Sequence, residues 1–198
     1  MKIALIVGGI VLVAVTYIFV FALMKAAKDD DTRVLHFRDD IPVSVTTPVP
    51  APTAWAKYPV PMDKAMQIHI VEEANRKGVS PAVVFAIIQT ESEYDAGKIG
   101  DNGNSYGLMQ IYASEHTERC QTLNAVNLLD PFANVSVGID ILAELGTYKM
   151  PLEWELMAYN GGVGYATAMW DEGTVSGYAS TVKALAEQIA EGVMVVTE

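Results

Sequence analysis

One carboxylate stands where the apolar face of a predicted helix would next continue. Val84, Ile87 and Ile88 follow the spacing of one helix face, and Glu91 takes the next position on that face. A carboxyl group that is partly buried among apolar side chains has a raised pKa and can stay protonated near neutral pH. The pattern therefore fits a general acid at Glu91, although a glutamate at the end of a helix can equally turn into solvent.

A glycine-rich segment, GDNGNSYGLMQI, follows this helix at residues 100–111. Its first half is polar and rich in residues that tolerate a positive φ, whereas its second half is apolar. We therefore predict a turn that leads into a buried hook at residues 107–111, which is the one strand-like stretch of the domain.

Helix start and stop signals divide the rest of the chain. Prolines and capping side chains begin several predicted helices, and glycines end several of them. The predicted helices cover residues 63–77, 81–91, 131–146, 151–160, 165–170 and about 176–190. The domain is thus predicted to be mainly α-helical.

Four short blocks resemble, in order and separation, the motifs of the lytic transglycosylase and goose-type lysozyme family. They are IIQTES at 87–92, SYGLMQI at 105–111, PFANVSVGIDIL with Asn134 and Gly138, and AYNGGVG at 158–164. The resemblance covers roughly residues 64–190. It implies a mainly α, lysozyme-like fold that binds the glycan strands of peptidoglycan and cleaves the bond from N-acetylmuramic acid to N-acetylglucosamine.

The same resemblance implies that Glu91 is the catalytic acid. In transglycosylases this residue then acts as a base, which helps the C6 hydroxyl of the sugar to attack its own anomeric carbon and gives a 1,6-anhydro product. One carboxylate can suffice for this reaction, unlike the two-carboxylate scheme of most glycosidases. No cofactor is expected.

The resemblance also implies which residues line the substrate cleft. Met109 and Gln110 are expected to receive acetamido groups, and Tyr159 is expected to face them with its hydroxyl near Glu91. Met109 and Tyr159 can instead be core residues, and Ser92 is expected to orient the loop rather than touch sugar. The predicted substrate-binding residues are Ser92, Ser105, Met109, Gln110, Tyr159 and Asn160.

A hydrolase is an alternative, because the loop is especially similar to that of goose-type lysozymes, in which an aspartate precedes the glycines. Asp101 occupies that place and could activate water as a second carboxylate, or it could simply form the turn. The position after GLMQI, where goose-type enzymes carry a further aspartate, is Tyr112 here, which favours the transglycosylase. A third hypothesis is a module that binds peptidoglycan without cutting it.

The N-terminus predicts a membrane anchor. Residues 3–24 carry no charge and are long enough to cross a bilayer as a helix; a cleaved signal peptide is the alternative. We divide the chain into an anchor at 1–24, a charged and proline-rich linker at 25–61 and a domain at 62–198. Basic residues on both sides of the anchor leave its orientation open, and the expected substrate places the domain outside the cytoplasmic membrane.

Composition narrows the possible partners. The formal net charge is -11, and no cluster of Lys and Arg offers the basic face that nucleic acids need. Cys120 is the one cysteine, and His36, His69 and His116 are scattered, so no disulfide framework or metal site is expected. The expected partners are glycan strands, a membrane and the proteins of an envelope machine or of a lipid-containing phage particle.

Overall fold

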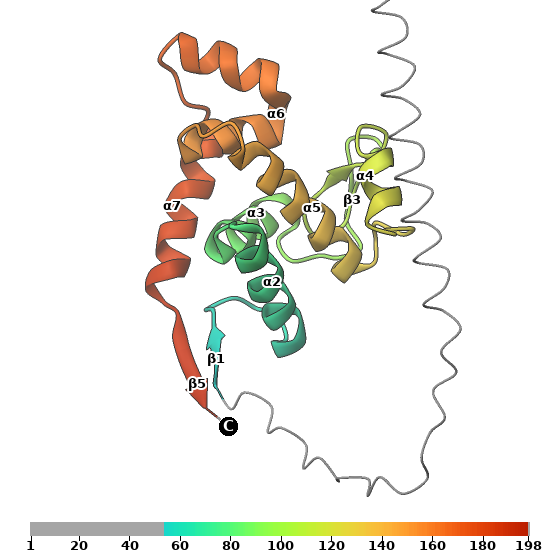
Figure 1. The fold of residues 1–198 in the computed structure, drawn as a ribbon, viewed down its shortest axis with the longest axis vertical. Helices are drawn as coiled ribbons and strands as arrows, with labels where there is room; N and C mark the ends of the chain where they lie inside the picture. The colour runs from blue at the N-terminus through green and yellow to red at the C-terminus, as the bar shows by residue number, and fades with distance from the viewer. Residues whose placement is uncertain (1–53, 198) are drawn as a thin grey trace, which may run out of the picture. The chain divides into compact units, whose positions relative to one another are not determined.

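The computed structural model describes residues 54–197, which form a mainly helical domain with two small antiparallel sheets (Figure 1). With the labels of Figure 1, the helices are α2 (Lys64–Lys77), α3 (Pro81–Ser92), α4 (Thr117–Thr122), α5 (Pro131–Gly146), α6 (Leu152–Asp171) and α7 (Gly177–Glu191). The strands are β1 (Ala54–Lys57), β2 (Ile99–Gly100), β3 (Ser105–Tyr106), β4 (Ile111–Tyr112) and β5 (Met194–Thr197).

Residues at the helix starts explain where the helices begin. The side chains of Asp63, Asp130 and Ser176 each accept a hydrogen bond from a backbone N–H of the first turn. Helix α3 begins at Pro81 after an extended Ser80, whose hydroxyl makes no capping bond. The predicted starts of these helices are therefore confirmed.

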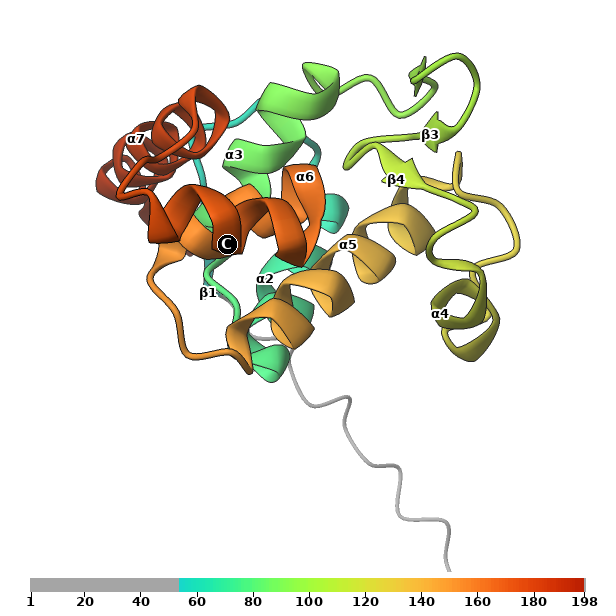
Figure 2. The ribbon, with the colours of Figure 1, turned by 90° about the horizontal axis from the view of Figure 1, so that it is seen from above.

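Helix α3 forms the centre of the core. Its residues from Ala82 to Ile88 are all buried, and it packs against α7 and α2. Seen from above, α7 lies to one side of α3, and β3, β4 and α4 lie to the other (Figure 2). From Ala82 to Ile88, α3 is apolar around its whole circumference. Glu91, in the last turn, is the first ionisable side chain along this helix.

The structure differs from the sequence prediction in three elements. The two helices predicted at 151–160 and 165–170 form one helix, α6, which bends at Gly162, where φ is 82° and ψ is 161°. Helix α4 is not predicted, because its sequence TERCQT buries no side chain and so shows no apolar periodicity. The hook at 107–111 is mainly a turn, with β3 before it and β4 starting at its last residue.

The first and last described strands pair with each other, β1 running antiparallel to β5. Just after β1, the backbone N–H of Tyr58 donates to the side-chain oxygen of buried Gln67 at 2.9 Å. The ring of Tyr58 also packs on Phe85, with 4.8 Å between the centroids. Residues 54–61, which the sequence analysis assigns to the linker, therefore belong to the folded domain.

The anchor predicted at 1–24 and the linker up to residue 53 lie outside the described residues. Between residues 54 and 197, no helix has both the length and the apolar character that crossing a bilayer requires. The membrane segment thus stays a sequence prediction.

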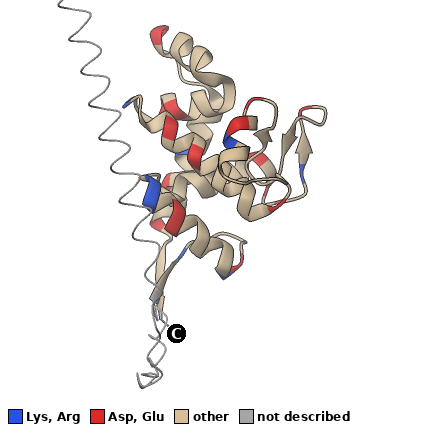
Figure 3. Cartoon of the chain, turned by 45° about the vertical axis from the view of Figure 1, so that its right-hand side comes forward, with Lys and Arg blue, Asp and Glu red and all other residues tan. Residues whose placement is uncertain are grey.

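Acidic side chains are widely spread over the domain (Figure 3). From Met62 onward the sequence has seven Lys and Arg against nineteen Asp and Glu. Internal pairs use some of these basic groups: Asp140 binds both Lys77 and Arg119, and Arg119 also binds Glu144. These pairs join α5 to both α2 and α4, and they leave Lys77 and Arg119 less available to an anionic partner.

Candidate active site

Glu91 is held at the end of α3 by two side chains from other parts of the chain. The hydroxyl of Tyr178, in the first turn of α7, donates to Glu91 Oε1 at 2.7 Å. The ammonium group of Lys98 donates to the backbone carbonyl of Glu91, also at 2.7 Å. A cation is favourable at the C-terminus of a helix, so Lys98 stabilises the helix end that carries the carboxyl group.

The surroundings of Glu91 favour its protonated form. Burial raises the pKa of Glu91, the Tyr178 hydrogen bond and the charge of Lys98 lower it, and the charge of Asp101 raises it, with a net rise. Because Tyr178 donates to Oε1, the acid proton belongs on Oε2. Burial and the nearby Glu91 also raise the pKa of Tyr178, which keeps its hydroxyl a donor.

Asn134 fixes the loop that faces Glu91. Its fully buried side chain donates to the carbonyls of Tyr106 and Leu128, at 2.7 and 2.9 Å, and accepts the N–H of Met109 at 2.8 Å. Gly107 has a φ of +74°, and an added Cβ there would lie 2.5 Å from both Asn134 Nδ2 and the Leu128 carbonyl oxygen. A side chain at position 107 would therefore displace the asparagine that holds the loop.

Met109 is a core residue in this structure. Its side chain is fully buried, and an added Cβ at Gly138 would come within 2.2 Å of Met109 Sδ. The pair Asn134 and Gly138 thus fixes the Met109 backbone and gives space to its side chain. A direct contact between sugar and this side chain would require Met109 to leave the core.

Ser92 and Gln110 hold the loop together. The hydroxyl of Ser92, which is almost fully buried, lies 2.8 Å from the carbonyl oxygen of Leu108 and so joins α3 to the loop. The side-chain amide of Gln110 donates to the carbonyls of Lys98 and Gly107, at 3.1 and 2.8 Å. Ser92 therefore orients the loop as the sequence suggests, whereas Gln110 both braces the loop and lines the pocket.

Tyr159 and Asn160 lie opposite this loop, on the part of α6 that precedes the bend at Gly162. The hydroxyl of Tyr159 donates to the Met109 carbonyl at 2.9 Å, so it ties α6 to the loop. Burial first, and then the charge of Glu91, raise the pKa of Tyr159. The hydrogen bond to Glu91 comes from Tyr178 and not from Tyr159, although the charge of Glu91 reaches both rings.

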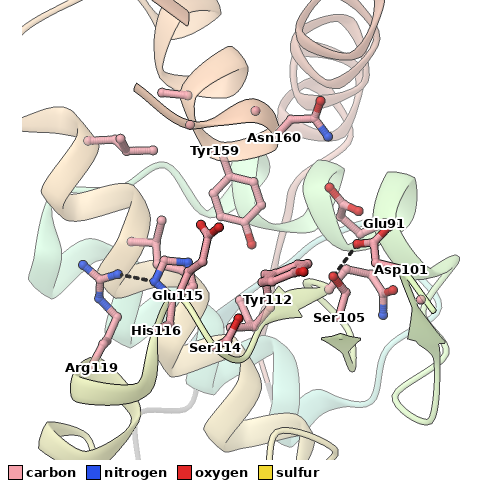
Figure 4. A pocket seen from close by; sticks show the side chains of 18 of the residues that line it. Glu91, Asp101, Ser105, Tyr112, Ser114, Glu115, His116, Arg119, Tyr159 and Asn160 are labelled. Atoms are coloured by element: carbon pink, nitrogen blue, oxygen red, sulfur yellow. Dashed lines mark hydrogen bonds between the residues drawn. The ribbon is translucent and has the colours of Figure 1, made fainter. Parts of the chain in front are cut away.

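Asp101 lies in the exposed turn between β2 and β3, at a φ of 47°. Its carboxylate accepts a hydrogen bond from the hydroxyl of buried Ser105. Both residues line the same pocket as Glu91, and Figure 4 shows the three on one side of it. The structure thus brings Asp101 to the site that the sequence assigns to it.

The pocket is open, with a volume of about 1240 Å³, and extends well beyond Glu91. Its far side is formed by residues that follow Tyr112, including His116 and Arg119 (Figure 4). An Arg119 nitrogen lies 3.0 Å from His116 Nδ1, and burial followed by the Arg119 charge lowers the pKa of His116. His116 is therefore neutral, with its proton on Nε2.

Tyr178 and Lys98 are site residues that the sequence does not predict, and no binding role is predicted for residues 112–119. The predicted helix start near Ser176 places Tyr178 in a first turn, but no local pattern connects that turn with α3. The residues on the far side of the pocket, such as His116 and Arg119, belong to a polar stretch without apolar periodicity. Within residues 54–197, no group of three or more His, Cys, Asp or Glu could hold a metal ion.

The fold and the pocket define a mainly helical, lysozyme-like domain. A family model described as "Transglycosylase SLT domain" matches residues 69–173, more than half of the chain, and the chain belongs to this family. The matched range contains Glu91, the loop at 105–110 and Asn134, but it ends before Tyr178.

A solved structure supports the fold. The chain resembles lytic transglycosylase Slt from Pseudomonas aeruginosa, determined as an inactive glutamate-to-glutamine mutant, with a TM-score of 0.56 and 20% sequence identity. The match covers 66% of this chain and 24% of that chain. The likeness therefore concerns the fold, and this chain spans about a quarter of the length of Slt.

Proposed function

We propose that the protein is a peptidoglycan lytic transglycosylase with Glu91 as its general acid. The observation that carries the proposal is the state of Glu91, which is half-buried at the pocket wall, has a raised pKa and accepts a hydrogen bond from Tyr178. A carboxyl group kept protonated beside an open pocket can donate a proton to a glycosidic oxygen. Family membership supports the same reaction.

The proposed reaction uses one carboxyl group twice, first as an acid and then as a base. Glu91 transfers the proton from Oε2 to the glycosidic oxygen, and the bond between that oxygen and the anomeric carbon breaks. The Glu91 carboxylate then takes the proton of the C6 hydroxyl as O6 bonds to the anomeric carbon. The product carries a 1,6-anhydro ring, Glu91 regains its proton, and no water is consumed.

The test is mass spectrometry of the fragments that the full chain releases from purified peptidoglycan, compared with Glu91→Gln. Because β1 pairs with β5, a fragment beginning at residue 60 lacks a strand of the domain, and the full chain in mild detergent is the better sample. Anhydro-ended fragments that disappear with Glu91→Gln support the proposal. Fragments that persist in the variant contradict the role of Glu91.

A hydrolase is the second candidate, because Asp101 lines the same pocket and its charge acts on Glu91. An inverting hydrolase would use Asp101 to activate water and would release fragments with reducing ends. Tyr112 stands where the resemblance calls for a further aspartate, which favours the transglycosylase. Reducing ends in the products would decide for the hydrolase.

A peptidoglycan-binding module without activity is the third candidate. It predicts that the full chain cosediments with insoluble peptidoglycan and releases no fragments. The raised pKa of Glu91 and its hydrogen bond to Tyr178 count against this candidate, because binding alone does not require a buried, protonated carboxyl group.

The proposal includes the place where the enzyme acts. Residues 1–24 would anchor the chain in a membrane, and the domain would lie on the outer side, where it cuts the wall locally for an envelope machine or for phage entry. Full-length protein should stay with membranes after carbonate extraction, and a chain without residues 1–24 should not. Recovery of the full chain in the soluble fraction would contradict the anchor.

A further inference from the structure

Tyr112 and Tyr159 line the pocket that holds Glu91, and Tyr178 contacts Glu91 itself. The three tyrosines differ in how their hydroxyls are used. Tyr159 and Tyr178 each donate a hydrogen bond within the domain, the first to Met109 and the second to Glu91. Tyr112 is 38% exposed, and its hydroxyl makes no hydrogen bond to residues 54–197. Hydrogen bonds within residues 54–197 therefore account for the hydroxyls of Tyr159 and Tyr178 but not for that of Tyr112.

The sheet register places Tyr112 beside Ser105, which holds the second carboxylate of the pocket. Tyr112 in β4 lies opposite Ser105 in β3, and residues paired in this way direct their side chains to the same face of the sheet. Ser105 holds the carboxylate of Asp101, whose charge acts on Glu91. Figure 4 shows the ring of Tyr112 between Ser105 and Tyr159, within the pocket.

The backbone around Tyr112 is held in place. The neighbouring Ile111 is fully buried, and the N–H of Ala113 donates to the carbonyl of Asn104 at 3.0 Å. The Tyr112 carbonyl itself accepts the N–H of Glu115 at 3.2 Å. An aromatic ring on a fixed strand loses little conformational freedom when a ligand covers it, which favours binding.

We infer that Tyr112 is a stacking platform for an N-acetylhexosamine unit of the glycan strand, next to the unit whose bond Glu91 cleaves. One face of a hexose ring carries C–H hydrogens with partial positive charge, and these fit the negative face of an aromatic ring. Much of the surrounding lining, including Glu115 and His116, is polar and fits the sugar hydroxyl and acetamido groups instead. This inference rests on the proposed function and names a residue that binds its substrate.

The test measures binding without cleavage. Full-length Glu91→Gln in mild detergent is titrated with tetra-N-acetylchitotetraose in a calorimeter, alone and combined with Tyr112→Ala, Tyr112→Leu or Tyr112→Phe. We expect Ala and Leu to weaken binding by about tenfold and Phe to stay close to the parent, because Phe keeps the ring. Tyr148→Ala is the matched control, since Tyr148 is 49% exposed and lies outside the pocket.

Three outcomes separate the hypotheses. Weaker binding by the folded Ala or Leu variant, with Phe and Tyr148→Ala near the parent, supports the platform; thermal unfolding establishes which variants are folded. Equal binding by all Tyr112 variants overturns the platform and leaves the proposed function standing. An absence of binding by the Glu91→Gln parent itself counts against both the platform and the proposed function.

Discussion

The two carboxylates of the pocket stand in opposite surroundings. Glu91 ends a buried helix, where Tyr178 holds its side chain and Lys98 holds its backbone. Asp101 lies in an exposed turn with a positive φ, and Ser105 supplies the hydrogen bond to its side chain. One carboxylate is thus desolvated and fixed by distant elements, whereas the other is solvated and fixed locally.

The difference in burial suits Glu91 and Asp101 to different chemical roles. Burial raises the pKa of Glu91 and so favours its protonated form, and the charge of Asp101 raises that pKa further. In the proposed transglycosylase, Asp101 would act through its charge on Glu91 and would not need to contact water or sugar. Changes at the two carboxylates and at the residues that hold them should therefore have unequal effects.

The largest effect is expected at Glu91 itself. Glu91→Gln keeps the shape of the side chain but removes the proton that is transferred, so the rate of fragment release should fall by about 10³-fold. Glu93→Gln is the matched control, because Glu93 is exposed at the C-cap of the same helix and lies outside the pocket. A comparable loss in both variants would point to damage at the helix end rather than to a missing acid.

Asn134→Ala should have the next largest effect, through stability. The substitution leaves the buried carbonyls of Tyr106 and Leu128 and the N–H of Met109 without their partner. We expect the free energy of unfolding to fall by about 3 kcal/mol, measured by urea denaturation.

The control for that change is Asn75→Ala, on the exposed side of α2. It should change the free energy of unfolding by less than about 0.5 kcal/mol. If the two variants are equally stable, the loop that faces Glu91 does not depend on Asn134, and its rigidity has another source.

The sequence predicts those parts of the site that follow from local sequence patterns. The apolar run that includes Val84, Ile87 and Ile88 predicts the buried helix that ends near Glu91. Pro81 and the capping side chains of Asp130 and Ser176 predict where α3, α5 and α7 begin, because these signals act within a few residues. Tyr178 reaches Glu91 across 87 residues of chain. Such a contact depends on how α7 packs against α3, which no local pattern encodes.

Contacts that are distant in sequence also determine the loop at residues 105–111 and the far side of the pocket, so the sequence does not predict their structure. The GLMQ segment is identified by its resemblance, but the burial of Met109 becomes visible when Gly138 is seen to make space for it. Helix α4 and the residues that precede it show no apolar periodicity. Ion pairs such as those of Arg119 with Asp140 and Glu144 hold this region to α5, and an apolar pattern does not reveal them. The strand β1 lies in a proline-rich stretch and forms because β5 pairs with it.

Tyr178→Phe should give an intermediate effect and a diagnostic shift in pH dependence. The hydroxyl lowers the pKa of Glu91, so its loss should raise that pKa and move the alkaline limb of the activity profile to higher pH. The rate at the optimum should fall by about tenfold, because the carboxyl group loses its orientation. Tyr165→Phe, at an exposed position outside the pocket, is the control. An unchanged alkaline limb would mean that Tyr178 does not act on the acid.

The smallest effect is expected at Asp101, and it separates the two carboxylates most directly. Asp101→Asn removes a negative charge that raises the pKa of Glu91, so the alkaline limb should move to lower pH, opposite to the shift in Tyr178→Phe. At the pH optimum the rate should change by less than about threefold, because a charge in exposed surroundings acts through water. Asp95→Asn, whose carboxylate caps a turn outside the pocket, should leave the profile unchanged.

The products of Asp101→Asn then decide what the second carboxylate does. If Asp101 acts through its charge, the fragments keep their anhydro ends and only the pH profile moves. If Asp101 activates water, its loss should remove activity on the scale of Glu91→Gln, and the unmodified protein should release reducing ends. The two carboxylates would then be partners in one displacement, and their unequal surroundings would be those of an acid and a base.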